Sequence, residues 1–399
     1  MKKKFKIVQR IVMVVFSFYP ADPRVRREAE ALVDEGIGVD IICLKDNFEQ
    51  KKEIVNGVKI YRLPLQRKRG RIIRYLFEYI CFFVLSFFFL SFLHLCYQYR
   101  VVHVHNMPDF LVFCSLFPKI CGSKVILDLH DPMPEVFMTK YSIPAYHSFI
   151  RLLLILEKLS VQYSDLILTP NIAFRDLFIS RSCPEAKIQI IMNSPDEKIF
   201  SRSRNINRNT ELKRKKFSIM YHGTIVERNG LKTALEALNE LKKKIPNIEF
   251  HVYGKGDFVE SFLRIVNELE INDLVFYHGQ VALESIAKAI EFIDVGLIPN
   301  NRTPFTEINL PTRIFEYLSM KKPVVVPRTK GILDYFNDKS INFFKAGDKC
   351  SLAEVIFDVY NNYAKQRALL NRGIAIYSKH RWELQKQYFV ELVKNLLKT

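Results

Sequence analysis

Short apolar runs of strand length alternate with helix-like segments along the first half of the chain. IVMVVF at 11–16 precedes a helical pattern at 24–35, which starts after Asp22-Pro23 and stops at Gly36, and GVDIICL follows. Parallel neighbouring strands need such a crossover, so this βαβ pattern predicts a parallel α/β sheet. The strands that we expect are 11–16, 38–44, 57–64, 101–106, 124–131, 165–170 and 187–193.

A second series of the same kind begins at residue 217. Gly230 opens the helical segment LKTALEALNELKKK, and apolar runs recur on both sides of it. Residues 201–216 are rich in Arg, Lys and Asn, lack an apolar period and are predicted to be a linker. We therefore expect an α/β protein with two Rossmann-like doubly wound domains, 1–200 and 217–376, and a final amphipathic helix at 377–399. The strands expected in the second domain are 217–224, 248–254, 274–279, 293–299 and 323–326.

The charge balance limits the partners of this chain. It has 60 Lys and Arg against 42 Asp and Glu, which gives a net charge of +18. Such an excess implies nucleic acid, an anionic membrane surface or a phosphorylated substrate as partner, and no nucleic-acid-binding motif supports the first. Seven cysteines without C-x-x-C spacing predict reduced thiols and a cytoplasmic protein. The apolar run near the start is too short for a secretory signal.

The stretch Asn309–Val326, NLPTRIFEYLSMKKPVVV, is predicted to be a helix that leads into a buried strand. We expect Asn309 to be the N-cap and Pro311 to lie in the first turn. Arg313 and Glu316 then share one face near the helix start, where free N–H groups favour an anion. The amides and Arg313 would hold a diphosphate, and Glu316 would accept hydrogen bonds from a ribose. An ordinary surface ion pair is an equal alternative.

Residues after the first strand are candidates for a ligand site in the first domain. Ligands of parallel sheets bind beyond the carboxyl ends of the strands, which places Tyr19, Asp22 and Arg24 at a rim. Asp22 has the alternative role of a helix cap.

Three histidines belong to the next two strands of the first domain. His130 follows a strand at its carboxyl end, although a histidine there is more often a structural hydrogen-bonding group than a catalytic one. His103 and His105 alternate with valines, and we expect them to face opposite sides of the sheet.

Gly254-Lys255-Gly256 follows the strand expected at 248–254. A G-x-G pair alone is weak evidence for a nucleotide site, because a dinucleotide fingerprint has its third glycine at the position of Val259. A tight strand-to-helix turn is an equally good interpretation.

The order and spacing of several motifs resemble glycosyltransferase family 4, whose members have the GT-B fold. The N-terminal motifs are DPRVRREAEALVDEG, HVHNMPD and DLHDPMPE, and the C-terminal ones are YHGTIVERNG, VYGKG, DVGLIP and LPTRIFEYLSMKKPVVV. The resemblance covers nearly the whole chain. It implies that the first domain receives an acceptor, that the second binds a nucleotide sugar, and that a helix around Trp382 crosses back to the first domain.

The resemblance also implies roles for single residues. Glu316 would bind the ribose, Arg228 and Arg313 would lie near the diphosphate, and His130 would line the cleft as a catalytic residue. The other positions implied are Gly223, Gly254 and Gly256 on the donor side and Tyr19, Asp22, Arg24 and His105 on the acceptor side.

The chain departs from the family pattern at two places. The family has two glutamates separated by seven residues, but Ile308 stands eight places before Glu316, with Glu307 one place off. A shifted loop would bring Glu307 in as the second catalytic residue, or this contact with the sugar is missing. The family's Arg/Lys pair is reduced, because Asn229 follows Arg228.

Neither a cofactor nor a metal is expected in the reaction. Enzymes of this family retain the anomeric configuration and commonly need no metal, and the sequence has no Asp-x-Asp pair to hold one. Cationic side chains and helix amides would then stabilise the departing diphosphate.

The segment Tyr79–Tyr97 is almost wholly apolar, and seven phenylalanines lie between Phe77 and Phe92. Its length permits a transmembrane helix, but strands of one sheet precede and follow it, and a single crossing would separate them. We expect it to bind the inner face of the cell membrane peripherally, where a lipid-linked acceptor is met. A buried core helix is the alternative. The basic residues that would assist membrane binding are Arg67, Lys68, Arg69, Arg71 and Arg74.

These features predict a glycosyltransferase that moves a sugar from a nucleotide sugar to a lipid-linked or other envelope saccharide in cell-surface polysaccharide synthesis. A nucleotide-sugar epimerase with the GT-B fold is a second hypothesis. The apolar segment and the basic residues beside it disfavour this hypothesis, because a soluble sugar nucleotide needs no membrane. A non-catalytic homologue that binds a nucleotide sugar is a third, and Ile308 is its best support.

Overall fold

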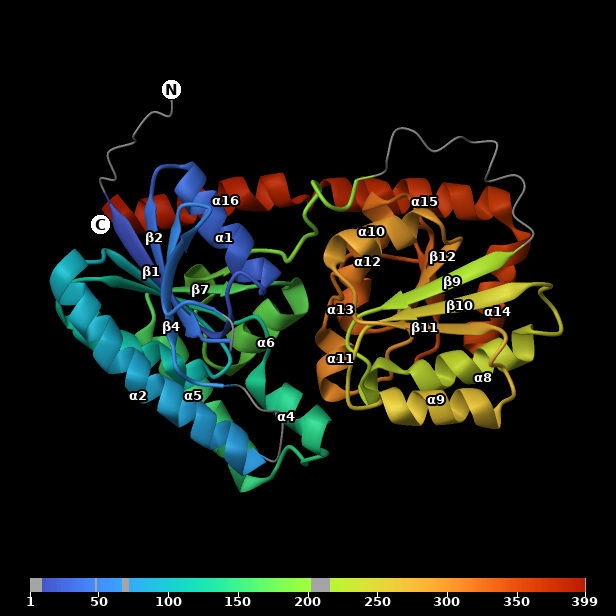
Figure 1. Ribbon diagram of the computed structural model, residues 1–399, viewed down its shortest axis with the longest axis horizontal. Helices are drawn as coiled ribbons and strands as arrows, with labels where there is room; N and C mark the ends of the chain where they lie inside the picture. Colours follow the sequence, from blue (N-terminus) through green and yellow to red (C-terminus); the bar gives the residue numbers. More distant parts are fainter. Residues whose placement is uncertain (1–8, 47–48, 67–71, 202–215, 399) are drawn as a thin grey trace. The chain divides into compact units, whose positions relative to one another are not determined.

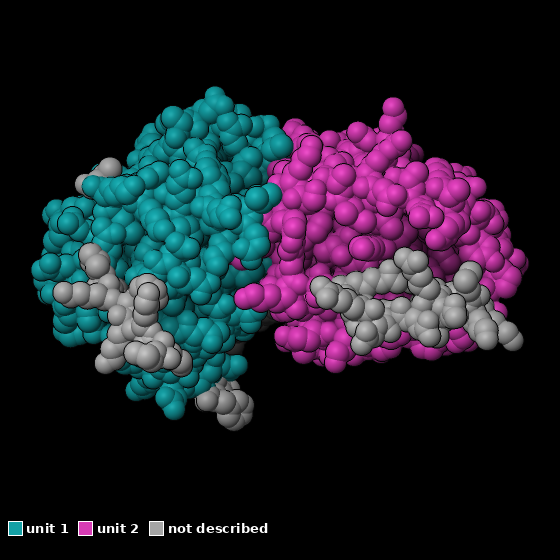
Figure 2. Space-filling model, turned by 90° about the horizontal axis from the view of Figure 1, so that it is seen from above, with its two compact units in different colours: residues 1–193, 383–399 teal, residues 194–382 magenta. Residues whose placement is uncertain are grey.

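A computed structural model describes residues 9–46, 49–66, 72–201 and 216–398 (Figure 1). The chain divides into two compact units, which Figure 2 colours separately. Unit 1 comprises Met1–Asn193 and Glu383–Thr399, and unit 2 comprises Ser194–Trp382. The predicted linker at 201–216 lies almost entirely outside the described residues.

Unit 1 is built on an eight-stranded sheet with the strand order β3-β4-β2-β1-β5-β6-β7-β8. All of its pairings are parallel except that of β3 with β4. The central strands are buried on both faces, which is why they appear as continuous apolar runs. The strands are β1 (Arg10–Phe18), β2 (Gly38–Leu44), β3 (Lys52–Val55), β4 (Val58–Leu63), β5 (Val101–His105), β6 (Lys124–Asp128), β7 (Leu166–Thr169) and β8 (Ile188–Ile190).

Helices from both ends of the chain cover this sheet. Asp22 caps the first of them, since its side chain accepts a hydrogen bond from the Arg24 N–H at 3.2 Å. The last helix belongs to unit 1, where Lys386 pairs with Asp34 at 2.8 Å. The helices are α1 (Pro23–Asp34), α2 (Ile72–Tyr97), η1 (Asp109–Ser115), α3 (Leu116–Ile120), α4 (Met133–Tyr141), α5 (Ser148–Tyr163), α6 (Ile172–Arg181), η2 (Glu185–Lys187) and α16 (Trp382–Lys398).

Unit 2 has a six-stranded parallel sheet with the order β11-β10-β9-β12-β13-β14. Its strands are β9 (Phe217–His222), β10 (Ile248–Tyr253), β11 (Val275–Gly279), β12 (Val295–Leu297), β13 (Val324–Pro327) and β14 (Asn342–Phe344). Its helices are η3 (Glu227–Asn229), α8 (Leu231–Leu241), α9 (Val259–Glu268), α10 (Leu283–Glu291), α11 (Pro304–Ile308), α12 (Arg313–Ser319), α13 (Lys330–Leu333), α14 (Lys349–Asn361) and α15 (Tyr363–Ser378). The two parallel sheets confirm the predicted α/β class with two doubly wound domains.

Helix α2 has one buried face and one exposed apolar face. It lies on the outside of unit 1 (Figure 1), and Tyr79 and Phe82 pack edge-on against Phe16 of β1 at centroid distances of 5.0 and 5.2 Å. Among the described residues, Ile73–Tyr97 is the one helix long and apolar enough to cross a membrane, and 28% of its most apolar window is buried inside the protein. This share does not fit the alternative of a wholly buried core helix.

The structure corrects the predicted start of the helix in Asn309–Val326. Asn309 is not its N-cap, because Asn309 ends α11 and donates its N–H to the Phe305 carbonyl at 3.1 Å. Helix α12 begins only at Arg313, after the turn in which the Ile314 N–H bonds to the Pro311 carbonyl at 3.0 Å. The predicted cap belongs to the neighbouring short helix, which the sequence pattern does not separate from α12.

Candidate functional site

The loops after β9 and β10 in unit 2 pack backbone against backbone. The Gly223 N–H donates to the Tyr253 carbonyl and the Ile225 N–H to the Lys255 carbonyl, both at 3.0 Å. A methyl group on Gly254 would lie 1.8 Å from the Gly223 carbonyl oxygen, and Gly254 has a φ of +141°. Only glycine permits this approach, so the packing of the two loops requires a glycine at position 254.

Arg313 of α12 reaches back to the first of these loops. Its Nη1 donates to the His222 carbonyl oxygen at 2.7 Å, and its guanidinium lies 4.7 Å from the centroid of the Tyr221 ring. A methyl group on Gly223 would lie 3.0 Å from Nη1. Because Gly223 has no side chain, the Arg313 guanidinium can lie at the carboxyl end of β9.

Glu316 lies one helical turn after Arg313 and faces the same strand end. Its Oε2 is 2.5 Å from His222 Nε2, and His222 Nδ1 is 2.9 Å from the Tyr317 hydroxyl. That hydroxyl also donates to the Met220 carbonyl at 2.9 Å, so Tyr317 ties the His222 ring to β9. His222 thus holds the carboxylate, a role that the sequence analysis missed.

Arg228 and Glu307, the other predicted residues of unit 2, have separate contacts. The Arg228 guanidinium lies 5.7 Å from the Phe305 ring centroid. Glu307 pairs with Arg302 at 2.8 Å and accepts from the Lys330 N–H at 3.3 Å. No described contact joins Glu307 to Glu316, and the replacement of the residue at 308 by Glu307 stays a prediction.

The predicted site residues of unit 1 gather at the carboxyl ends of β1, β5 and β6. The Arg24 guanidinium lies 3.5 Å from the Asp22 carboxylate, and although burial opposes it, Arg24 lowers the pKa of Asp22 to about 2. Burial, followed by the charge of Arg24, lowers the pKa of His130 to about 3, which leaves this ring neutral near pH 7. Tyr19 is fully buried, and its carbonyl accepts from Arg62 at 2.9 Å.

His105 and His130 are hydrogen-bonded to each other. His105 Nδ1 lies 3.0 Å from His130 Nε2, and their parallel rings are 5.2 Å apart. The rings of His103 and His105 are only 4.2 Å apart, so the prediction that they face opposite sides of the sheet is wrong. Side chains two positions apart in a strand point to the same face.

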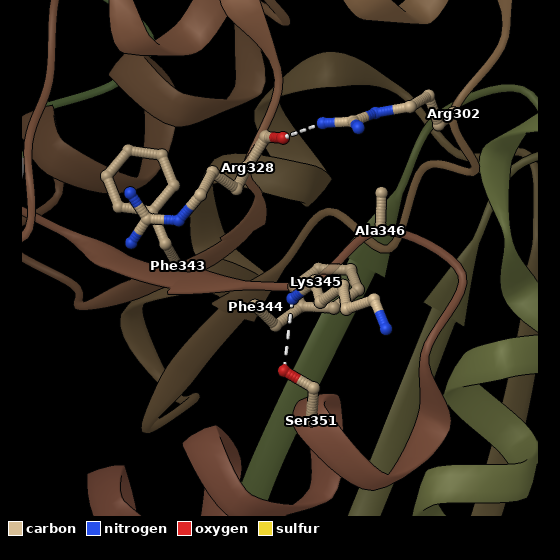
Figure 3. A pocket seen from close by; sticks show the side chains of 7 residues that line it. All are labelled: Arg302, Arg328, Phe343, Phe344, Lys345, Ala346 and Ser351. Carbon is tan, nitrogen blue, oxygen red and sulfur yellow. Dashed lines mark hydrogen bonds between the residues drawn. The ribbon is translucent and has the colours of Figure 1, made fainter.

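A separate cavity of about 530 Å³ lies beside β13 and β14 of unit 2 (Figure 3). Two arginines and a lysine stand around it, with Arg302 donating to the Arg328 carbonyl at 2.7 Å. None of the predicted donor-binding residues lines it. Its lining residues are Arg302, Arg328, Phe343, Phe344, Lys345, Ala346 and Ser351.

Two family models match successive parts of the chain. The model of the glycosyl transferase 4-like domain matches residues 21–194, and the model of glycosyl transferases group 1 matches residues 203–375. The second match contains the two glycine loops together with Arg313 and Glu316.

Two curated relatives are similar in sequence. An uncharacterized glycosyltransferase of Methanocaldococcus jannaschii is 22% identical over 89% of each chain. The amylovoran biosynthesis glycosyltransferase AmsK of Erwinia amylovora is 22% identical over 48% of this chain and 47% of its own.

Solved structures resemble the whole chain. Sucrose-phosphate synthase from Thermosynechococcus elongatus has a TM-score of 0.80 at 18% identity, covering 98% of this chain and 99% of its own. Anabaena HepE in complex with UDP-glucose has a TM-score of 0.72 at 14% identity, covering 97% and 99%. WaaG, a glycosyltransferase involved in lipopolysaccharide biosynthesis, has a TM-score of 0.71 at 14% identity, covering 96% and 99%. These likenesses confirm the predicted GT-B fold.

Proposed function

We propose, from the premise that this chain belongs to the GT-B glycosyltransferases of the family-4 type, that it moves a sugar from a nucleotide sugar to an envelope saccharide. The acceptor in this proposal is lipid-linked, the anomeric configuration is retained, and the product serves cell-surface polysaccharide synthesis. The names of two similar proteins, AmsK and WaaG, mention amylovoran and lipopolysaccharide biosynthesis, which supports this choice.

The observation that carries the proposal is the placement of Arg313 and Glu316 beside the glycine loops. Arg313 offers a cation beside the Gly223 loop, which suits a diphosphate. Glu316 offers a carboxylate held by His222, which suits two ribose hydroxyls. Anabaena HepE was solved with UDP and with UDP-glucose, so UDP-sugars are the first donors to test.

The direct test measures donor binding and then transfer. UDP-, GDP- and ADP-sugars are screened for thermal stabilisation, because a ligand that binds the folded state raises its stability by mass action. The labelled donor that binds is then incubated with a lipid-linked saccharide. A labelled lipid product supports the proposal, whereas an altered sugar nucleotide would indicate an epimerase and binding alone a non-catalytic homologue.

Glu316→Gln is expected to weaken nucleotide-sugar binding while the unit stays folded. The substitution keeps the size of the side chain but removes a charge-assisted acceptor worth about 1.5–3 kcal/mol, which corresponds to roughly a tenfold to hundredfold rise in Kd. Titration calorimetry with the donor identified above measures the change.

Glu240→Gln is the matched control, since this glutamate of unit 2 lies on α8 and pairs with Lys349 at 3.7 Å. Its donor Kd should stay near that of the wild type. An unchanged Kd for Glu316→Gln would remove Glu316 from the donor site.

Transfer is expected to persist after EDTA treatment and to gain nothing from added Mg²⁺ or Mn²⁺. In the proposal Arg228, Arg313 and backbone amides stabilise the departing diphosphate, which a metal does in other transferases. Initial rates before and after chelation measure this. Activity that is lost to EDTA and restored by Mg²⁺ or Mn²⁺ would contradict it.

The exposed face of α2 is proposed to dock on the inner surface of the cell membrane. Large apolar side chains recur there every three or four positions, so they form one stripe along the helix. Its ends are the most open, with Ile73 79% and Leu95 69% exposed. The members of the stripe are Ile73, Phe77, Ile80, Val84, Phe88, Phe92 and Leu95.

The connectivity of unit 1 supports peripheral binding over a transmembrane span. Strand β4 precedes α2 and β5 follows it, and both belong to the sheet in which β1 pairs with β2 and β5. A helix that crossed the bilayer once would place these strands on opposite sides. The proposed location is therefore cytoplasmic, on the membrane surface. Arg67, Lys68, Arg69 and Arg71 of the basic cluster lie outside the described residues, and Arg74 pairs with Glu78 at 3.2 Å.

The combined substitutions Phe77→Ser, Phe88→Ser and Phe92→Ser are expected to abolish flotation with anionic vesicles. Burying each phenylalanine contributes about 1.5–3 kcal/mol, so the loss of three should lower membrane partitioning by well over a hundredfold. Flotation on a density gradient measures it.

Phe292→Ser is the control, because Phe292 is 58% exposed but lies in unit 2. This variant should float like the wild type. A wild-type protein that stays soluble in low salt and does not float would contradict membrane docking.

A further inference from the structure

Four side chains of metal-ligating type meet inside unit 1. Glu28 comes from α1, His103 and His105 from β5, and Asp128 from β6. One ligand atom of each residue lies within 4.8 Å of those of the other three. All four are buried, and none is more than 5% exposed. The pairing of β5 with β6 sets His105 directly beside Asp128.

Several polar atoms of this cluster lack hydrogen-bond partners among the described residues. They are Glu28 Oε2, both ring nitrogens of His103, and His105 Nε2. Buried polar atoms in folded proteins are nearly always bonded to protein, water or an ion, because desolvation without a partner is costly. The unpartnered atoms of three neighbouring residues therefore point to a ligand between them.

The spacing of these atoms fits metal coordination better than hydrogen bonding. His103 Nε2 lies 3.5 Å from Asp128 Oδ2 and 3.9 Å from Glu28 Oε2. Hydrogen bonds are usually about 2.7–3.2 Å long. Ligand atoms about 2.0–2.1 Å from a tetrahedral zinc ion are separated by about 3.3 Å.

A divalent cation also matches the charge of the cluster in its metal-bound form. Glu28 and Asp128 then bind as carboxylates, and the imidazole ligands are neutral. The nearby guanidinium groups have other partners, since Arg24 pairs with Asp22 and Arg27 donates to Asn193. A divalent cation between the two carboxylates would bring the net charge of the site to zero.

We propose that Glu28, His103, His105 and Asp128 bind one divalent cation of the Zn²⁺ class. Two imidazole nitrogens with two carboxylate oxygens suit such an ion, whereas Mg²⁺ and Ca²⁺ prefer oxygen alone. Four protein ligands leave no open position, which makes the site structural. The cation fastens α1 to β5 and β6, and it takes no part in the diphosphate chemistry proposed for unit 2.

The surroundings of the cluster give the cation a second effect. When His105 Nε2 binds the metal, His105 Nδ1 keeps its 3.0 Å hydrogen bond to His130 Nε2. The ion therefore fixes the orientation of the His105 ring, and that ring in turn positions His130. Phe389 of α16 packs against the His103 ring at a centroid distance of 5.8 Å and shields that side of the site.

The test measures the metal content and stability of the full chain. Protein stripped with dipicolinate is titrated with Zn²⁺ and then with Co²⁺. We expect about one tightly bound ion per chain, a melting temperature raised by several degrees, and the intense visible bands of tetrahedral Co²⁺. Binding of less than about a tenth of an ion per chain, no thermal shift with Zn²⁺, or the weak bands of octahedral Co²⁺ would each overturn the proposal.

Variants assign the ligands. Glu28→Gln and His103→Gln should each lower Zn²⁺ affinity by at least about tenfold and remove the Zn²⁺-dependent thermal shift. His94→Gln is the matched control, because His94 is also buried in unit 1 and has an unpartnered ring nitrogen, but it lies outside the cluster. Wild-type affinity in Glu28→Gln and His103→Gln would overturn the assignment. If either variant fails to fold, the Co²⁺ spectrum of the wild type decides.

Discussion

Arg313→Ala is expected to lower kcat/KM for transfer by about a hundredfold to a thousandfold, the range found when a group that stabilises developing charge is removed. Arg313 is held at the end of β9 by the His222 carbonyl and by the face of Tyr221. In the proposed reaction its charge faces a diphosphate that becomes more negative as the sugar leaves, so its loss should act on kcat as well as on binding. Steady-state kinetics with the identified donor measures both.

Arg313→Lys and Arg228→Ala are the controls for this experiment. Arginine can bond the His222 carbonyl with one nitrogen and a phosphate with another, whereas lysine has the same charge on a single nitrogen. We therefore expect Arg313→Lys to lower kcat/KM by an intermediate factor. Arg228 lies over the ring of Phe305, and its removal should cost only about tenfold. Equal losses for Arg228→Ala and Arg313→Ala would contradict the leading role of Arg313.

The alternation of apolar runs and helices predicts the central strands of both sheets because these strands are buried on both faces. It does not predict β3 or β14, which lie at the edges of the sheets. Strand β3 is partly exposed along its length, and β14 has only three residues. The other two edge strands, β8 and β11, are predicted at 187–193 and 274–279, so the exposure of β3 and the shortness of β14 explain the difference better than their edge positions do.

The candidate site is predictable only where its residues are close in the sequence. Arg313 and Glu316 are three residues apart, and this helical spacing alone predicts that they share one face. The partner of Glu316, His222, lies 94 positions away, and nothing in YHGT marks it as the residue that holds this carboxylate. Contacts of that kind follow from the strand order, which places β9 in the middle of its sheet.

Gly254→Ala is expected to destabilise unit 2 by more than about 4 kcal/mol, a loss seen only when a substitution breaks the structure at a critical point. The new methyl group would lie 1.8 Å from the Gly223 carbonyl oxygen and 2.9 Å from its carbon, and backbone atoms cannot move aside as a side chain can. The loops after β9 and β10 must then separate and lose the bond from the Gly223 N–H to the Tyr253 carbonyl. Urea denaturation measures the free energy of unfolding.

Gly347→Ala separates this steric conflict from the backbone strain of an alanine at positive φ. Gly347 also has a positive φ, +76°, but no atom of the described residues lies within 4 Å of its added methyl group, so the strain alone should cost about 1–2 kcal/mol. A similar loss in the two variants would show that the loops after β9 and β10 do not need their close contact. Arg313 bonds the carbonyl of His222, the residue before Gly223. A much larger loss of stability in Gly254→Ala, together with a loss of donor binding, would therefore show that the packing of these two loops positions Arg313.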